Sequence, residues 1–431
     1  MNKPQLGKRC PFDADLMNPS TYENFIPFDL FRSLRTKCPV SLQLDSQRDK
    51  NFWAVTRRSD IDFISKNPKL FSSRENLAHP QPISENPDTM QIARQLVINM
   101  DPPEHLRFRR VIKDAFTGKA VDRIDNLMRE FAKEIVDSVA SRGHCDFAQE
   151  VAAEMPLFVI CALVDMPLER RKNFSDLVTT MIGMDDPDLC VSEEDGQNAA
   201  AQIFGIAMEL AENHLKNPND GTLIDTLLNG NIDGEALTEF EFCTFFLILI
   251  AGAVETTRTA TSHGMRLLIE HPDQHNLLIE KPELIEGAIE EILRFYPPFI
   301  FMQRTAVQDI QVGEMDIEKG DILRLYYPAA NHDPEIFGVD ADCFDVTRSM
   351  RIDDLRTKHR TFGVGQHFCV GSHLARRELL VLFEEFVPRL KNPKFSKPPE
   401  ILKSNFIPGI KEMHITFDKE EPLNQNYSRD K

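Results

Sequence analysis

A single thiol is presented by the loop Thr361-Phe-Gly-Val-Gly-Gln-His-Phe-Cys-Val-Gly371, in which the cysteine is Cys369. Three glycines within nine residues allow positive φ angles and close backbone approach, so peptide N–H groups can point at the sulfur. The pattern becomes helical from Ser372, and the free amides at a helix start favour thiolate over thiol. A stabilised thiolate is a nucleophile or a metal ligand, whereas an ordinary cysteine is most often a small buried apolar residue.

An acid and a threonine interrupt the longest apolar helical pattern of the chain. This pattern opens with the capping box Thr238-Glu-Phe-Glu241, ends near Glu270, and contains Ala251-Gly-Ala-Val-Glu-Thr-Thr257. An acid beside a threonine could deliver protons to dioxygen in an apolar pocket. The alternative is a threonine pair that bonds to backbone carbonyls beside a cavity.

Two further spacings place charged side chains on one face of a helix. Asp101-Pro-Pro103 is a strong helix start, and His105 and Arg109 follow four residues apart. Glu291 and Arg294 lie three apart in a later helical pattern. Taken alone, the first pair is a solvated basic face and the second a surface ion pair.

The loop pattern F-G-x-G-x-H-x-C-x-G, followed by x-x-L-A-R, resembles the haem-binding loop of the cytochrome P-450 family. The resemblance covers about residues 25–418 and includes H-x-x-x-R, the acid-threonine helix and E-x-x-R in the family's order. It implies that Cys369 is the proximal ligand of the iron of haem b, and that its electron density favours O–O cleavage. The implied haem-binding residues are His105, Arg109, Ala251, Gly252, Arg304, Phe362, His367, Cys369 and Gly371.

The same resemblance implies roles for three other groups of residues. Glu255 and Thr256 would supply protons for oxygen activation, and Ala253 stands where many members carry a second glycine. Glu291, Arg294 and Arg348 would form a buried structural cluster that supports the haem loop. The implied substrate pocket consists of Leu247, Thr256, Phe299, Ile300, Phe301, Met302 and Ile407.

Composition limits the compartment and the partners. The chain has 431 residues and a formal net charge of −18, which argues against nucleic acid or an anionic membrane as partner. The eight cysteines are scattered without a C-x-x-C pair, and the N-terminus has no apolar segment, so we expect a cytoplasmic monomer without a signal peptide or membrane anchor.

The fold implied by the resemblance is mainly α with small β-sheets, with a long central helix over the haem. We expect a flexible segment at 1–24, one haem-thiolate domain at 25–418 and a polar tail at 419–431. Residues 40–44 and 52–56 alternate as a pair of hairpin strands, and 312–327 reads as a second hairpin. Residues 77–97 read as a long irregular loop, which covers the substrate in the family.

The expected function is a haem-thiolate monooxygenase that hydroxylates an apolar small molecule with O2 and two electrons. The electrons would come from NAD(P)H through a ferredoxin reductase and a [2Fe-2S]-type ferredoxin. A basic patch on the thiolate side would dock this acidic ferredoxin. Terpenoids or steroid-like molecules are the expected substrates. Fatty acids, aromatic hydrocarbons, a peroxygenase or isomerase activity and a haem-based sensor remain alternatives. The expected patch comprises Arg110, Lys113, Lys358, Arg360 and Arg377.

Overall fold

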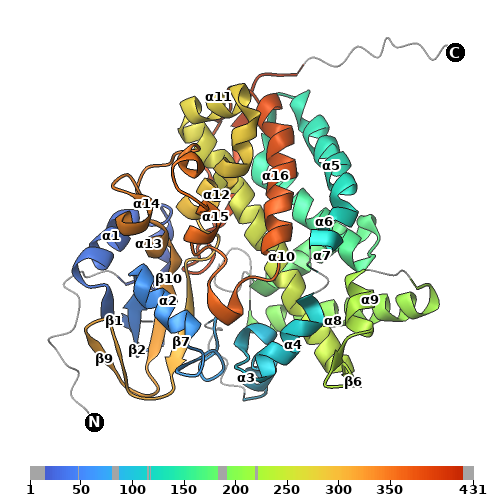
Figure 1. Ribbon diagram of the computed structural model, residues 1–431. Helices are drawn as coiled ribbons and strands as arrows, with labels where there is room; N and C mark the ends of the chain where they lie inside the picture. Colours follow the sequence, from blue (N-terminus) through green and yellow to red (C-terminus); the bar gives the residue numbers. More distant parts are fainter. Residues whose placement is uncertain are drawn as a thin grey trace.

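The computed structural model describes residues 15–46, 48–79, 87–113, 116, 118–182, 192–218 and 222–420. Helices form most of the molecule, and the largest sheet lies at one side with α1 and α2 (Figure 1). This confirms the expected mainly α fold with small sheets. The helices are α1 (Phe28–Lys37), α2 (Arg58–Lys66), α3 (Pro87–Ala93), α4 (Glu104–Lys113), α5 (Gly118–Ala140), α6 (Glu154–Val164), α7 (Arg171–Ile182), α8 (Glu193–Lys216), α9 (Leu223–Leu228), α10 (Glu239–Glu270), α11 (Pro272–Glu280), α12 (Ile285–Phe295), α13 (Tyr327–Asn331), α14 (Pro334–Phe337), α15 (Leu355–Lys358) and α16 (Ser372–Arg389).

The main sheet has five strands in the order β1-β2-β10-β7-β3. The expected pair at 40–44 and 52–56 is confirmed, since β1 and β2 are antiparallel with Val40 opposite Val55. Trp53 is buried and its indole N–H donates to Asp321 at 2.8 Å. The strands are β1 (Val40–Asp45), β2 (Lys50–Val55), β3 (Phe71–Ser72), β4 (His144–Asp146), β5 (Asn231–Ile232), β6 (Glu235–Ala236), β7 (Phe301–Ala306), β8 (Ile310–Val312), β9 (Met315–Ile317), β10 (Ile322–Tyr326), β11 (Lys394–Phe395), β12 (Glu400–Ile401), β13 (Ile410–Glu412) and β14 (His414–Thr416).

The expected hairpin at 312–327 is wrong. The hairpin consists of β8 and β9, with Val312 opposite Met315 and Gly313 in the left-handed region at φ 57°. The later strand, β10, lies between β2 and β7 in the main sheet. Almost every residue of β10 is buried, which is the pattern of a central strand covered on both faces rather than of one arm of an exposed hairpin.

The long helix α10 crosses the middle of the molecule (Figure 1). Its capping box is confirmed, because the Thr238 hydroxyl accepts from the Glu241 amide at 3.2 Å and the Glu241 carboxylate accepts from the Thr238 amide at 2.8 Å. By length and composition alone α10 could cross a membrane. However, it packs against α6, α8, α12 and α16, and this contact on several sides is that of a core helix.

The segment at the start of the described chain is packed, so the expected flexibility of 1–24 is wrong for residues 15–24. Leu16, Met17 and Tyr22 are buried, and the Tyr22 hydroxyl donates to the Leu16 carbonyl at 3.0 Å. The side chain of Asn405 donates to the Met17 carbonyl at 2.6 Å. These apolar anchors and polar ties fix the segment, while residues 1–14 lie outside the described residues.

Three smaller expectations also change. The segment 77–97 contains α3 and a 3₁₀ turn at Val97–Asn99, although residues 80–86 lie outside the described part. Cys38 is disulfide-bonded, so the cysteines are not all reduced thiols as their scatter suggested. In the expected tail at 419–431, Glu420 forms an ion pair with Arg389 at 2.5 Å, and residues 421–431 are outside the described chain.

Candidate active site

The cysteine loop is shaped by glycines at positions that other residues disfavour. Gly363 and Gly365 have φ angles of 70° and 79°, in the left-handed region. A Cβ on Gly365 would lie 2.5 Å from the Ser65 carbonyl oxygen, so this position also needs the missing side chain. The Cys369 amide donates to the Phe362 carbonyl at 2.9 Å, which closes the loop just before α16 begins. The loop therefore presents Cys369, which is exposed as a residue although protein atoms crowd its thiol.

The protein alone does not make Cys369 a thiolate. Burial among protein atoms raises the pKa of the thiol, although a backbone hydrogen bond from Gly371 and the charges of Arg109 and Arg376 lower it. The loop lowers the pKa of the Cys369 thiol as expected, but the loss of solvent around the thiol raises this pKa by more. A coordinating metal removes the proton outright, so these surroundings favour the thiolate once a metal cation is bound.

Four basic side chains from three segments meet beside this loop. His105 and Arg109 come from α4, Arg304 from β7 and His367 from the loop itself. The rings of His105 and His367 have centroids 4.0 Å apart, and Arg109 donates to the Phe368 carbonyl. Burial lowers the pKa of His105 to about 4, and the charges of Arg109 and Arg304 add to this effect. Both histidines are therefore neutral N–H donors at pH 7, since burial also lowers the pKa of His367.

This basic cluster is incompletely paired among the described residues. His105 is buried, yet its Nδ1 has no hydrogen-bond partner among the described residues. Arg304 is also buried, and burial lowers its pKa, although the negative charge of Asp101 partly offsets this effect. Among the described residues, neither Arg304 nor Arg109 forms an ion pair with a carboxylate within 4 Å. A buried unpaired charge is costly, so the cluster is built for a ligand that carries carboxylates. The propionates of haem fit this requirement.

The small residues of α10 fit the same group. A Cβ on Gly252 would meet no atom within 4 Å, so open space adjoins the helix at this residue. The Thr256 hydroxyl donates to the Gly252 carbonyl at 2.8 Å, which is the carbonyl-bonded alternative that the sequence left open. The residues expected to bind haem are therefore compatible with it.

Glu255 points away from Thr256 toward a polar region. Its carboxylate pairs with Arg258 at 3.4 Å, and both side chains are nearly buried. Arg258 also donates to the carbonyls of Ile410 and Lys411 at 3.3 Å each. Glu255 and Arg258 line a cavity of about 290 Å³ between α10, α7 and β13. The Glu255 carboxylate thus faces this cavity rather than the open space beside Gly252.

Two of the expected substrate-pocket residues are enclosed by protein. Ile300 and Phe301 have no exposed surface, and the Phe301 ring packs against Tyr326 with centroids 5.4 Å apart. Both side chains join the core beside β10, and their role in the substrate pocket stays a prediction. Phe299 and Met302 are only partly buried. The other two apolar pocket residues, Leu247 and Ile407, are 9% and 4% exposed.

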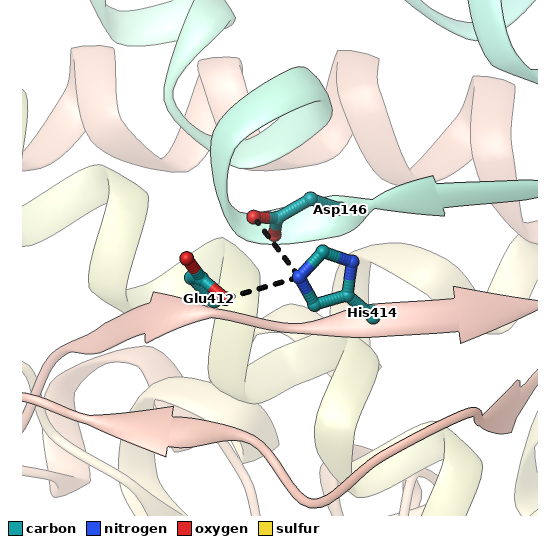
Figure 2. Close-up of side chains that lie close together, drawn as sticks. All are labelled: Asp146, Glu412 and His414. Atoms are coloured by element: carbon teal, nitrogen blue, oxygen red, sulfur yellow. Dashed lines mark hydrogen bonds and ion pairs between the residues drawn. The ribbon is translucent and has the colours of Figure 1, made fainter.

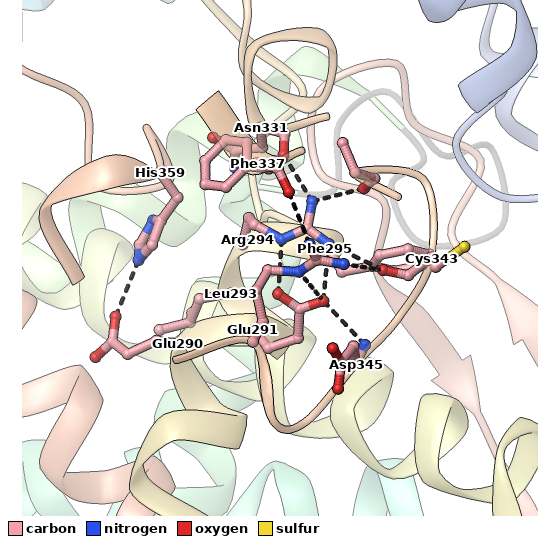
Figure 3. A network of polar contacts seen from close by, with 12 residues as sticks. Glu290, Glu291, Leu293, Arg294, Phe295, Asn331, Phe337, Cys343, Asp345 and His359 are labelled. Carbon is pink, nitrogen blue, oxygen red and sulfur yellow. Dashed lines mark hydrogen bonds and ion pairs between the residues drawn. The ribbon is translucent and has the colours of Figure 1, made fainter. Parts of the chain in front are cut away.

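The expected structural cluster is fully buried. Figure 3 shows two of its members, Glu291 and Arg294, within their network of polar contacts. Glu291 accepts from Arg294 at 2.6 and 2.7 Å and from Arg348 at 3.0 Å, and none of the three side chains is exposed. Arg294 also donates to the Asn331 carbonyl at 2.8 Å. The Asn331 side chain in turn donates to Thr361 at 3.0 Å, at the start of the cysteine loop. The cluster therefore supports this loop through Asn331.

Comparison with known proteins decides the family. The cytochrome P450 family model matches residues 77–416. The chain belongs to the cytochrome P450 family. A steroid C26-monooxygenase of Rhodococcus jostii is 32% identical over 94% of this chain and 85% of that protein. A linalool 8-monooxygenase of Pseudomonas putida is 33% identical over 94% and 98% of the two chains. A Mycobacterium marinum cytochrome P450 solved with pseudoionone has a TM-score of 0.84 and 28% identity, covering 95% and 99% of the two chains.

The protein is therefore a cytochrome P450 monooxygenase, and the family implies the use of haem and O2. When bound, haem supplies the oxygen chemistry. The sequence analysis assigned no role to three supporting residues of this cytochrome P450. Arg376 stands in the L-A-R motif and lies 4.3 Å from the centre of the Phe362 ring. Asn331 and Arg258 had no sequence signal of their own.

Proposed function

We propose that this cytochrome P450 hydroxylates an apolar terpenoid or steroid-like molecule with O2 and two electrons from a ferredoxin. The observation that carries the haem-thiolate part is the exposed residue Cys369 beside a basic cluster in which the buried Nδ1 of His105 has no hydrogen-bond partner among the described residues. The substrate class is supported by the relatives named for steroids and linalool. It is also supported by the uncharged side chains of Phe299, Met302 and Ile407. A fatty acid is the second candidate, because a methyl-branched lipid omega-hydroxylase of Mycobacterium tuberculosis is 32% identical over 90% of the chain.

The roles of individual residues are part of this proposal. Cys369 ligates the iron of haem b, and His105, Arg109, Arg304 and His367 hold its carboxylates by charge-assisted or neutral hydrogen bonds. Phe362 and Gly371 shape the loop around the sulfur, while Ala251 and Gly252 leave room on the other side. Gly252 is open enough for this purpose, since a Cβ there would touch nothing.

Glu255 and Thr256 deliver protons to the oxygen site. The carboxylate of Glu255 lines the cavity of about 290 Å³, whose polar walls can hold water. Rotation of the Glu255 side chain away from Arg258 would carry a proton from this cavity toward Thr256. The Thr256 hydroxyl would then exchange its bond to Gly252 for one to the oxygen site. Without such a relay, the apolar surroundings would exclude the protons that O–O cleavage consumes.

We propose that electrons enter beside the cysteine loop. Arg110 is exposed and follows Arg109, which contacts the loop at Phe368. Arg356 is exposed and lies 3.1 Å from His373 near the start of α16. Two bases at this face of an acidic protein would attract an acidic [2Fe-2S]-type ferredoxin, itself reduced from NAD(P)H by a reductase.

The basic patch expected from the sequence changes in membership. Arg360 is 6% exposed and its guanidinium pairs with Asp62 at 2.6 Å, so its inclusion is wrong. Arg377 is engaged with Asp125, and the side chain of Lys113 lies outside the described residues. Lys358 is half-buried and remains with Arg110 and Arg356. The cytoplasmic location and the monomeric state remain parts of the proposal.

The decisive experiment is the carbon monoxide difference spectrum of the reduced protein. We expect a strongly red-shifted Soret band that Cys369→Ala abolishes. Cys343→Ala is the matched control, because Cys343 is also an exposed free thiol and its backbone contacts survive the change. A band at the ordinary haem-protein position, or one that survives in Cys369→Ala, would contradict thiolate ligation by this residue.

Two further measurements separate the finer parts of the proposal. Titration with terpenes, steroids and branched fatty acids should give a spin-state shift with one class, and the responding class identifies the substrate. For the electron donor, Arg110→Glu and Arg356→Glu should slow reduction by ferredoxin and weaken its salt dependence. Lys216→Glu at the end of α8 is the control. Equal reduction rates in all three variants would refute docking at the cysteine face.

A further inference from the structure

A histidine and two carboxylates from β4, β14 and the end of β13 lie close together, away from the site described above (Figure 2). Strands β4 and β14 are antiparallel, and their register places Asp146 directly opposite His414. Glu412 precedes His414 by two residues, so the alternation of side chains in extended chain places both on the same face. Residues separated by more than 260 positions are thereby brought to one point.

The ligand atoms have the spacing of a metal site. The Nε2 atom of His414 lies 3.0 Å from an oxygen of Glu412 and 3.9 Å from an oxygen of Asp146. All three atoms lie within 4.8 Å of one another. Ligands bound to tetrahedral Zn²⁺ are about 3.3 Å apart, given metal–ligand distances of about 2.0–2.1 Å. The His414–Glu412 and His414–Asp146 separations therefore differ from this spacing by about 0.3 and about 0.6 Å, which rotations of the exposed His414 and Glu412 side chains can supply.

The Asp146 carboxylate is already oriented for this purpose. One of its oxygens accepts hydrogen bonds from the amides of Met413 at 2.9 Å and Ala148 at 3.2 Å. The other oxygen faces the imidazole of His414. Such fixed outer contacts are what orient metal ligands in proteins. The Asp146 side chain is 14% exposed, whereas Glu412 and His414 are 42% and 38% exposed, which leaves one side open for water ligands.

A positively charged side chain already lies beside this cluster. The ammonium of Lys397 lies 2.8 Å from the same Glu412 oxygen that faces His414. The Lys397 side chain is 51% exposed on a flexible stem, so it can leave for solvent when a stronger cation arrives. Lys397 is therefore a competitor for the position rather than a permanent member of the cluster.

We propose that Asp146, Glu412 and His414 bind a divalent transition metal, with Zn²⁺ as its representative. Three protein ligands and one water complete a tetrahedral shell around Zn²⁺. The imidazole nitrogen favours Zn²⁺ over Mg²⁺ and Ca²⁺, which require more oxygen ligands. The metal ties β14 and the end of β13 to β4, and its role is structural, separate from the haem chemistry.

The test is a calorimetric titration of the chelator-treated, haem-loaded protein with Zn²⁺. We expect one site per chain, with affinity reduced about tenfold or more in His414→Gln and in Glu412→Gln. His144→Gln is the matched control, because His144 is an exposed histidine on the same ladder and should leave the affinity unchanged. Lys397→Gln should strengthen binding, since it removes the competing ammonium.

The variants distinguish a metal site from an ordinary polar cluster. Absence of saturable binding in the wild type overturns the proposal, as does an equal loss in His144→Gln and His414→Gln. Weaker binding in Lys397→Gln also overturns it, because a lysine that competes with the metal cannot support it. The carbon monoxide spectrum of each variant shows that the protein is folded and haem-loaded, so loss of Zn²⁺ binding is separable from misfolding.

Discussion

Replacement of Glu291 by Gln tests how the cysteine loop is supported. The change keeps the shape of the side chain but removes the negative charge between two guanidiniums that have no exposed surface. Breaking a buried ion pair by neutralising one partner costs about 3–5 kcal/mol, because a buried charge loses its counter-charge. Arg294 depends on Glu291 more than Arg348 does, since Arg348 also lies 3.4 Å from Asp340. We therefore expect a loss of about 3–5 kcal/mol in the free energy of unfolding.

The matched control is Asp340→Asn in the same network. Asp340 is 38% exposed and pairs with Arg351 at the surface, so its neutralisation should cost at most about 1 kcal/mol. Urea unfolding followed by circular dichroism measures both variants, and haem retention after gel filtration reports on the loop. Glu291→Gln should also lose haem, because Arg294 holds Asn331 and Asn331 holds Thr361. A cost for Glu291→Gln no larger than that of Asp340→Asn would refute the reasoning.

Three other changes have defined outcomes. Burial alone would raise the pKa of Glu290, but hydrogen bonds from His359 and Arg376 lower it from 4.5 to about 2. The ionised Glu290 carboxylate stabilises the fold by about 3 kcal/mol above pH 4.5, and this stabilisation is lost as the pH falls toward 2. In Glu290→Gln, the free energy of unfolding measured with urea should therefore fall less steeply between pH 4.5 and 2. Gly252→Leu should block haem incorporation by filling open space, whereas Gly205→Leu, which is equally open, should not change the Soret absorbance per protein. Arg258→Met should lower kcat with little effect on the carbon monoxide spectrum, and an unchanged kcat would exclude a role in holding Glu255.

Local sequence was enough to predict elements whose determinants lie within a few residues. The capping box at Thr238 and the pairing of β1 with β2 are such elements, because a cap or a tight connection fixes them locally. The determinants of the cysteine loop are also local, since its glycines and the helix start that follows all lie within residues 361–372. The position of β10 in the sheet is not determined locally. It lies between β2 and β7, and β2 is far away in the sequence.

Site residues that belong to a sequence motif were predicted. Site residues whose role depends on a contact with a distant part of the chain were missed. His105 and His367 were named from motifs, and the structure brings their rings together. The prediction that Arg360 faces solvent was wrong, because a basic residue beside a motif gives no information about its ion-pair partner. In this protein the partner is Asp62. Likewise, the run at 299–302 is apolar throughout, and only the position of β7 between β10 and β3 decides that Phe301 is buried.

The cluster of Asp146, Glu412 and His414 shows the same limit most clearly. Glu412 and His414 are two residues apart, which in an extended chain is the spacing of two ligands on one face. Nothing in the sequence around Asp146 marks it as their partner, because the register of β4 against β14 decides which residue stands opposite His414. A shift of one residue would turn Asp146 to the other face and leave two ligands, too few to hold Zn²⁺ firmly. The metal site is therefore a property of the strand register, and a sequence motif for it does not exist in this chain.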